Sequence, residues 1–208
     1  MLIQGKRKML YISIIFIFSL ISVLLGVFIG VPFVGVTESR VFAITIISLL
    51  VLVVIDSVCA LFVRYCLPKK VFNPFLKGYR VGKFERKFYE RIGVRKWKDR
   101  IPEAGQLFAN FAKTEIADMT NNEYVYKFMS ETIYAEIMHW LSAIFSFLIV
   151  FIDLSLALTV ALPLIVGNMI LNILPVIVQR YNRPKLMVLY QRNERMKAKR
   201  IENKEKEE

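Results

Sequence analysis

The chain has 208 residues, of which 56% are hydrophobic, and it nevertheless carries a formal net charge of +12. The apolar and charged residues are segregated into long uncharged runs and dense basic stretches, whereas a soluble domain of this length would interleave them to build one core. Composition therefore excludes an ordinary soluble domain and predicts an integral membrane protein.

Two apolar runs near the N-terminus are each long enough to cross a bilayer, which takes about 20 mainly apolar residues in a helix. Residues 9–34 carry no charge, and residues 41–63 carry only Asp56. The first run could instead belong to a signal peptide, because three basic residues precede it. It is longer than the usual apolar region of about 7–15 residues, and no cleavage site of the A-x-A type follows it. We therefore expect two retained transmembrane helices, at about 9–34 and 41–63.

A basic and aromatic stretch follows the second run. Residues 82–98 are rich in Lys and Arg, and Phe84, Phe88, Tyr89 and Trp97 are interleaved with them. This pattern suits a helix that lies on an anionic membrane surface. A nucleic-acid-binding patch has a similar composition, but apolar runs on both sides disfavour it, and we expect no nucleic-acid partner. The sequence predicts a basic interfacial helical segment over about 70–105.

The last apolar tract, residues 137–178, is about twice the length that one span needs. It is interrupted only by His139 near its start and by Asp153. A turn near Asp153 must therefore divide the tract into two helices.

The boundaries of these two helices follow from local signals. Thr120 and Glu123 have the spacing of a capping box, so the third helix is expected to start at about 120 and to run over 120–152. The fourth helix is expected over 156–178. Residues 193–208 are charged without an apolar pattern, which predicts a tail that is disordered or a frayed helix.

Lys and Arg residues define the expected orientation in the membrane. Three precede the first run, 15 fall within residues 64–135 and 10 within residues 180–208, whereas the other connections contain only Arg40. The positive-inside rule then places the N-terminus, the middle segment and the C-terminus in the cytoplasm. The predicted fold is an all-α membrane protein with four transmembrane helices, formed by a single membrane domain over 1–192 and a cytoplasmic tail over 193–208.

His139 is the only histidine and lies where the third span begins. Glu136 precedes it by three residues, so the two share a helix face about 4.5 Å apart along the axis. Glu131 lies roughly 12 Å away on that axis and could flank the same groove without bonding to His139 directly. An imidazole with a neighbouring carboxylate can act as a general base; the alternative is an interfacial histidine that hydrogen-bonds lipid or water. No metal site is expected, because the Glu-x-x-His spacing has no second copy.

Two asparagines lie within the fourth predicted span. Asn168 and Asn172 are four residues apart, so they are stacked on one helix face. Polar groups are costly within a bilayer. They either form hydrogen bonds between helices or line a polar pocket.

Two basic motifs bracket the third and fourth helices: VRKWK at residues 94–98 and QRYNRP at residues 179–184. Arginine forks match phosphate oxygens. These motifs could therefore hold a pyrophosphate, the phosphates of a thioester cofactor or a lipid headgroup; the alternative is simple anchoring of the topology. The candidate substrate-binding residues are Arg95, Lys96, Trp97, Lys98, Trp140, Asn168, Asn172, Gln179, Arg180, Tyr181, Asn182 and Arg183.

In order and spacing, three motifs resemble those of the glycosyl-4,4'-diaponeurosporenoate acyltransferases, bacterial membrane enzymes of staphyloxanthin-type carotenoid biosynthesis. The motifs are VRKWK at 94–98, AEIMHW at 135–140 and VQRYNRPKL at 178–186. The resemblance covers roughly residues 61–189, and Glu131 stands where the family has a Glu before its Glu-x-x-His-Trp. The chain departs from the family by an additional first hydrophobic helix and a longer charged tail. The resemblance implies transfer of a fatty acyl group to a sugar hydroxyl of a carotenoid glycoside or another glycolipid, in the bacterial plasma membrane.

Residues and resemblance together predict a mechanism at the cytoplasmic membrane face. His139, with Glu136 or Glu131, removes the proton from the acceptor hydroxyl, and the oxygen attacks the carbonyl of an acyl-CoA or acyl-carrier-protein thioester. The basic residues that we expect to hold the donor's phosphates, or an anionic acceptor, are Arg95, Lys96, Arg180 and Arg183. No bound cofactor is expected, and the oligomeric state is left open.

A covalent acyl-enzyme is not favoured, because the sequence contains neither a Ser or Cys nucleophile elbow nor a His-x₄-Asp motif. The main alternative is a non-enzymatic membrane protein that binds lipids or assists assembly through its basic motifs. A transporter ranks last, because the outer half of the spans contains almost no polar residues.

Overall fold

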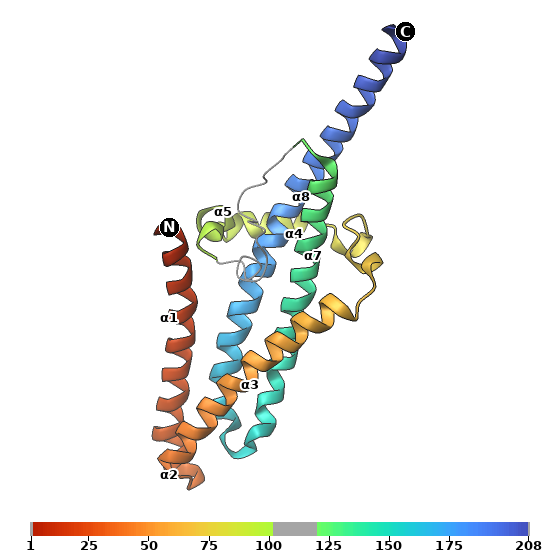
Figure 1. Ribbon diagram of the computed structural model, residues 1–208. Helices are drawn as coiled ribbons and strands as arrows, with labels where there is room; N and C mark the ends of the chain where they lie inside the picture. Colours follow the sequence, from red (N-terminus) through yellow and green to blue (C-terminus); the bar gives the residue numbers. More distant parts are fainter. Residues whose placement is uncertain (1, 102–119, 208) are drawn as a thin grey trace. The chain divides into compact units, whose positions relative to one another are not determined.

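The computed structural model describes residues 2–101 and 120–207, and every regular element in those ranges is a helix (Figure 1). Four segments are long and apolar enough to cross a membrane, as predicted. They are Met9–Val34, Glu38–Tyr65, Asn122–Ile152 and Leu154–Asn203. Their length and composition indicate a multi-pass membrane protein.

The described residues form two compact units. Of the described residues, the first unit contains mainly 2–67 and 136–176, and the second mainly 68–98, 120–135 and 177–207. These units are clusters of contacts, so the single membrane domain predicted over 1–192 stays a prediction.

In the first unit, a tight connection joins the first two spans (Figure 1). Helix α1 (Leu2–Leu25) continues through a π-helical turn, η1 (Gly26–Gly30), into α2 (Val31–Val34). Gly35 ends α2 in the left-handed conformation, with φ of 75°, which a glycine adopts without strain. Helix α3 (Glu38–Tyr65) then begins after Thr37, whose side chain accepts a hydrogen bond from the backbone N–H of Arg40. This N-cap explains why the helix begins a few residues before the predicted position of 41.

The predicted turn at Asp153 is confirmed. Helix α7 (Asn122–Phe145) tightens into the 3₁₀ segment η5 (Ser146–Ile152), and Asp153 then adopts an extended conformation. The chain returns through η6 (Leu154–Leu156) and η7 (Ala157–Ala161) into α8 (Leu162–Glu207).

Small residues allow α1 and α8 to approach closely in the first unit. A Cβ atom added to Gly167 would lie 2.8 Å from Cβ of Phe18, which is too close for two carbon atoms. Nearby, the hydroxyl of Ser22 donates to the carbonyl of Val160 over 3.0 Å. Close approach at small residues and interhelical hydrogen bonds are the usual ways in which membrane helices associate.

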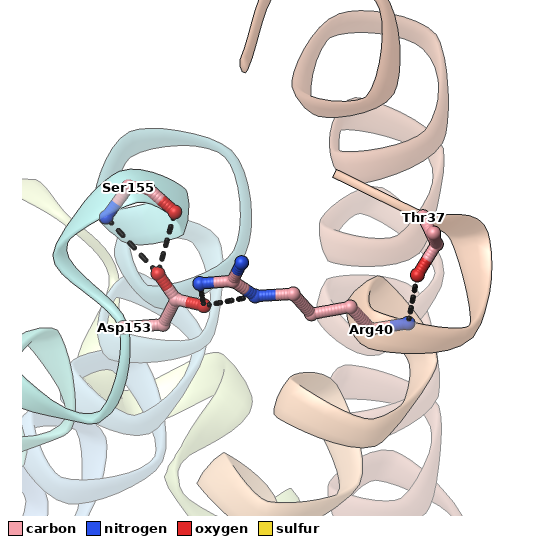
Figure 2. A network of polar contacts seen from close by, with 4 residues as sticks. All are labelled: Thr37, Arg40, Asp153 and Ser155. Atoms are coloured by element: carbon pink, nitrogen blue, oxygen red, sulfur yellow. Dashed lines mark hydrogen bonds and ion pairs between the residues drawn. The ribbon is translucent and has the colours of Figure 1, made fainter. Parts of the chain in front are cut away.

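An ion pair connects the two turns at one end of the first unit (Figure 2). Nη2 of Arg40 lies 2.7 Å from Oδ2 of Asp153, and Nε of Arg40 donates to the same oxygen over 2.9 Å. The other oxygen, Oδ1, accepts from the backbone N–H and the hydroxyl of Ser155. Burial raises the pKa of Asp153, but the hydrogen bonds from Ser155 and Arg40 outweigh it, and the pKa lies below its usual value.

Because this pKa is lowered in the folded protein, the ion pair stabilises the fold above the usual carboxyl pKa of 3.8 and loses its effect as the pH falls through the lower folded value. Replacing Asp153 by Asn should therefore reduce thermal stability in detergent at pH 7, by at most about 1 kcal/mol because Arg40 is half exposed. The difference from wild type should shrink at pH 3. An equal difference at both pH values would contradict the assignment, and the Arg40→Gln variant should reproduce the effect.

The second unit contains the basic stretch predicted to lie at the interface. It comprises the 3₁₀ turns η2 (Lys69–Phe72) and η3 (Lys77–Tyr79), followed by α4 (Lys83–Arg91) and α5 (Val94–Trp97). Gly93, with φ of 64°, separates the last two helices. The stretch is thus helical; its position on a membrane surface stays a prediction, and residues 102–105 of the predicted segment lie outside the described residues.

The start of α7 differs from the prediction. Its N-cap is Asn121, not Thr120, because Oδ1 of Asn121 accepts hydrogen bonds from the backbone N–H groups of Glu123 and Tyr124. Consecutive Thr and Asn residues both suit this position, and the sequence does not distinguish them.

Helix α8 spans Leu162–Glu207 and is much longer than the predicted helix over 156–178. The apolar pattern ends near residue 178, but the following residues are mostly Arg, Lys, Glu, Gln, Leu and Met, which are good helix formers. Pro184 removes one backbone donor and crowds the carbonyl of the preceding turn, but α8 continues through it. The charged segment after residue 193 is therefore helical to Glu207. The sequence had predicted either a disordered tail or a frayed helix there.

Candidate functional site

His139 lies in a buried polar cluster of the first unit. Its side chain, with 7% of its surface exposed, faces Asn172 from α8, and Nδ1 of His139 lies 2.8 Å from Oδ1 of Asn172. The amide nitrogen of Asn172 donates to the backbone carbonyl of Asn168 over 3.0 Å. This bond orients the amide so that its oxygen faces the ring. We therefore assign the proton to Nδ1, which leaves Nε2 as the basic nitrogen of the imidazole.

Further polar atoms surround this pair. The carboxylate of Asp56, in α3, interacts with Ser142 and Asn172. Within the described residues, however, Oδ1 of Asp56, Oγ of Ser142 and Nδ2 of Asn168 are buried without a hydrogen bond of good geometry. Unsatisfied polar atoms in an apolar environment are costly. Their concentration beside a histidine is the arrangement expected where the polar part of a substrate binds.

The two glutamates predicted to assist His139 belong to different units. Glu136 is buried, with 4% exposed, on the same helix as His139. The residue on Nδ1 is Asn172, so an orienting role for Glu136 stays a prediction, as does the role of Glu131, which belongs to the second unit. Trp140, beside His139, is 45% exposed, and its substrate contact likewise stays a prediction.

Arg180 is held in an ion pair of the second unit. Nε of Arg180 donates to Oε1 of Glu85 over 2.5 Å, and Nη2 donates to Oε2 over 2.9 Å. The hydroxyl of Tyr89 also donates to Oε1 of Glu85. The hydrogen bond from Arg180 is the main reason that the pKa of Glu85 lies below its usual value. The pair ties α8 to α4, and a phosphate could reach the Arg180 fork only by breaking it.

Arg183 is also engaged in contacts within the second unit, with the carbonyl and the ring of Tyr79. Only 2% of it is exposed, its Nη1 donates to the carbonyl of Tyr79 over 3.2 Å, and its guanidinium lies 5.8 Å from the centre of the Tyr79 ring. Gln179, one turn earlier, is buried as well. The QRYNRP motif therefore contributes largely to packing around α8.

The remaining candidates are more accessible. Arg95 and Lys96 of α5 are exposed, and Trp97 donates from its indole nitrogen to the carbonyl of Ile92 over 3.1 Å. Tyr181 and Asn182 are half-buried, and Lys98 is likewise of intermediate exposure. In sum, the structure brings His139, Asn168 and Asn172 together, while the basic candidates belong to the second unit.

Two acidic residues that contact predicted site residues, Asp56 and Glu85, were not themselves predicted as site residues. Asp56 is an ionisable residue within a span, which is itself a signal of function, but nothing in the sequence connects it with Asn172. Glu85 is an acid within a basic stretch, which indicates an internal ion pair, but its partner Arg180 is 95 residues away.

A family model described as glycosyl-4,4'-diaponeurosporenoate acyltransferase matches residues 68–192. Proteins of that name from Staphylococcus aureus strains bovine RF122 / ET3-1 and USA300 are each 33% identical to the chain over 122 residues. The protein from strain N315 is 36% identical over 115 residues. In each case the match covers 52% of this chain and 61% of the relative, so the chain spans about three-fifths of the length of these relatives. No solved structure matches the chain.

Proposed function

The chain belongs to the glycosyl-4,4'-diaponeurosporenoate acyltransferase family, whose model matches more than half of its length, and from this premise we propose that it is a membrane O-acyltransferase. Its acceptor is a sugar hydroxyl of a glycosylated lipid, either a carotenoid glycoside or another glycolipid. Its donor is a fatty acyl thioester, carried by coenzyme A or by an acyl carrier protein.

The observation that carries this proposal is the buried contact between His139 and Asn172. A fixed Nδ1–H tautomer presents Nε2 as a general base. Nε2 takes the proton of the acceptor hydroxyl while the hydroxyl oxygen attacks the carbonyl carbon of the thioester. The C–S bond then breaks, the ester forms, and the imidazolium returns the proton to the leaving thiolate.

The unsatisfied polar atoms nearby support binding of a polar acceptor group. Oδ1 of Asp56 can accept a hydrogen bond from a sugar hydroxyl, and Nδ2 of Asn168 can donate one. Truncated substrates without a sugar would leave these atoms unpaired, which disfavours them.

The distribution of Lys and Arg supports the orientation that we propose, with both termini and the site on the cytoplasmic side of the bacterial plasma membrane. Acyl thioesters are then available on the side of the membrane where the reaction takes place.

The proposal is tested by mass spectrometry of lipids from cells that make a glycosylated carotenoid, with and without this chain. We expect a new species heavier than the acceptor by one fatty acyl group, and the His139→Ala variant should not produce it. Unchanged lipids in cells whose membranes contain the protein, with several glycolipid acceptors present, would overturn the proposal.

The alternative, a lipid-binding protein without activity, rests on the basic motifs as headgroup contacts. Two of the arginines expected to make such contacts, Arg180 and Arg183, are engaged with Glu85 and Tyr79. We therefore favour the enzyme.

A further inference from the structure

An open pocket of about 410 Å³ lies within the second unit. Its polar lining comes from two helices: Arg86, Tyr89 and Glu90 from α4, and Tyr181 and Lys185 from α8. The volume lies within the range of small-molecule sites in proteins, about 300–1,000 Å³. Tyr181 and Pro184 belong to the QRYNRP motif, whereas Arg86 and Lys185 were not among the candidate substrate-binding residues.

One wall of the pocket is held firmly. Tyr89 is 5% exposed, and its hydroxyl donates to Glu85, which is itself fixed by two hydrogen bonds from Arg180. The ring of Tyr89 packs edge-to-face against Tyr181, with centroids 6.5 Å apart. The ion pair between Glu85 and Arg180 thus shapes the pocket rather than contacting its ligand.

The cations of the pocket are available for a ligand. Arg86 and Lys185 are exposed and lie on different helices, and within residues 2–101 and 120–207 neither has an ion-pair partner. Nζ of Lys185 lies 4.6 Å above the centre of the Tyr181 ring, a cation–π contact that positions the ammonium while leaving its donors usable. Two cations against one carboxylate, that of Glu90, give the lining a net positive charge.

The rest of the lining is apolar. Val81, Pro184 and Val188 complete the pocket beside the two tyrosine rings. A small inorganic anion would leave this surface uncovered, whereas an ester of phosphate with an organic group would contact it as well as the cations.

We propose that this pocket binds a phosphate ester, with Arg86 and Lys185 on the phosphate and the tyrosine rings beside the organic group. The proposal rests on the proposed function, because a coenzyme thioester is a phosphate ester, and it transfers the donor-binding role from Arg180 and Arg183 to Arg86 and Lys185. The same chemistry is present in the headgroup of an anionic phospholipid, and the experiment separates these two sources.

The test measures binding to the purified full chain in detergent, without acceptor and without turnover. Coenzyme A is the first probe. Arg86→Gln and Lys185→Gln should each weaken its binding about tenfold or more, because each removes a charge-assisted hydrogen bond. Lys83→Gln is the matched control: it removes a cation from α4 that does not line the pocket, and should change binding little.

Glu90→Gln provides an effect of opposite sign. Removing the carboxylate from the lining should tighten binding about two- to fivefold, since an exposed charge acts weakly on an incoming anion. A purely structural role of Glu90 would not produce a gain.

Two further probes identify the source of the phosphate ester. Pantetheine, which lacks phosphate, should not discriminate wild type from the Arg86 variant. Vesicles of phosphatidylglycerol, compared with phosphatidylcholine, test the headgroup. An Arg86→Gln loss seen with coenzyme A assigns the pocket to the thioester, and one seen only with phosphatidylglycerol assigns it to the lipid; either supports a phosphate-ester site.

The proposal is overturned if the Arg86 and Lys185 variants bind coenzyme A and phosphatidylglycerol as the Lys83 variant does. Such a result leaves acyl transfer itself untouched. Conversely, suppose that coenzyme A or phosphatidylglycerol binds as proposed but no acceptor yields an acylated product. That result would reject the proposed function and keep the assignment of the pocket as a phosphate-ester site.

Discussion

Replacing His139 by alanine is expected to lower the rate of acyl transfer by about 10²–10⁴-fold, the usual contribution of a general base. His139 is the only histidine of the chain, and its Nδ1 is bonded to Asn172 within a buried cluster. Without the imidazole, the base whose orientation the contact with Asn172 fixes is lost. The measurement is the initial rate of formation of acylated glycolipid in membranes containing matched amounts of protein.

A second variant separates chemistry from folding. His139→Gln keeps an amide that can still bond to Asn172, but an amide does not accept a proton at neutral pH. It should therefore be as inactive as His139→Ala while its thermal stability in detergent stays near that of wild type. Turnover within a few fold of wild type in His139→Gln would rule out general-base catalysis by this residue.

Replacing Asn172 by leucine should reduce kcat by about 10²-fold, with a smaller change in KM for the acyl donor. The reason is that Oδ1 of Asn172 accepts from Nδ1 of His139 and so fixes both ring orientation and tautomer. Small misplacements of a catalytic group cost rates of this order. The change is read from steady-state kinetics with varied donor.

Asn172→Asp is the matched comparison, because aspartate keeps an oxygen acceptor at the same position. It should recover part of the activity that Asn172→Leu loses, because the oxygen on Nδ1 is kept while the donor to the carbonyl of Asn168 is lost. If both variants are equally impaired, the amide acts by some means other than accepting the proton of Nδ1; if both are as active as wild type, the contact has no catalytic importance.

The helices were largely predictable because apolar length is a strong signal in a membrane protein. The turn at Asp153 was predictable for the same reason, since residues 137–178 are too long for one span. The end of α8 was not predictable from hydropathy, because hydropathy indicates only which residues can be buried in lipid. Continuation of the helix beyond residue 178 depends on the intrinsic helix propensity of the residues.

The candidate site was predictable only residue by residue. His139, Asn168 and Asn172 were recognisable because polar groups are costly within a span. The pairing of His139 with Asn172 depends on the rotation and register of α7 against α8, which side-chain packing decides. For the same reason, the pair of Arg180 with Glu85 could not be derived from motifs, and one of the arginines expected to hold phosphate proved to be already paired.

The ion pair of Arg40 and Asp153 has a consequence for how the chain is made. It joins residues 113 positions apart, one in the turn region of the α1–α3 hairpin and one in the turn between α7 and α8. During synthesis from the N-terminus, the first hairpin is complete long before Asp153 leaves the ribosome. Arg40 therefore lacks this carboxylate partner until the second hairpin has inserted. Formation of the ion pair then requires that the two hairpins have packed together.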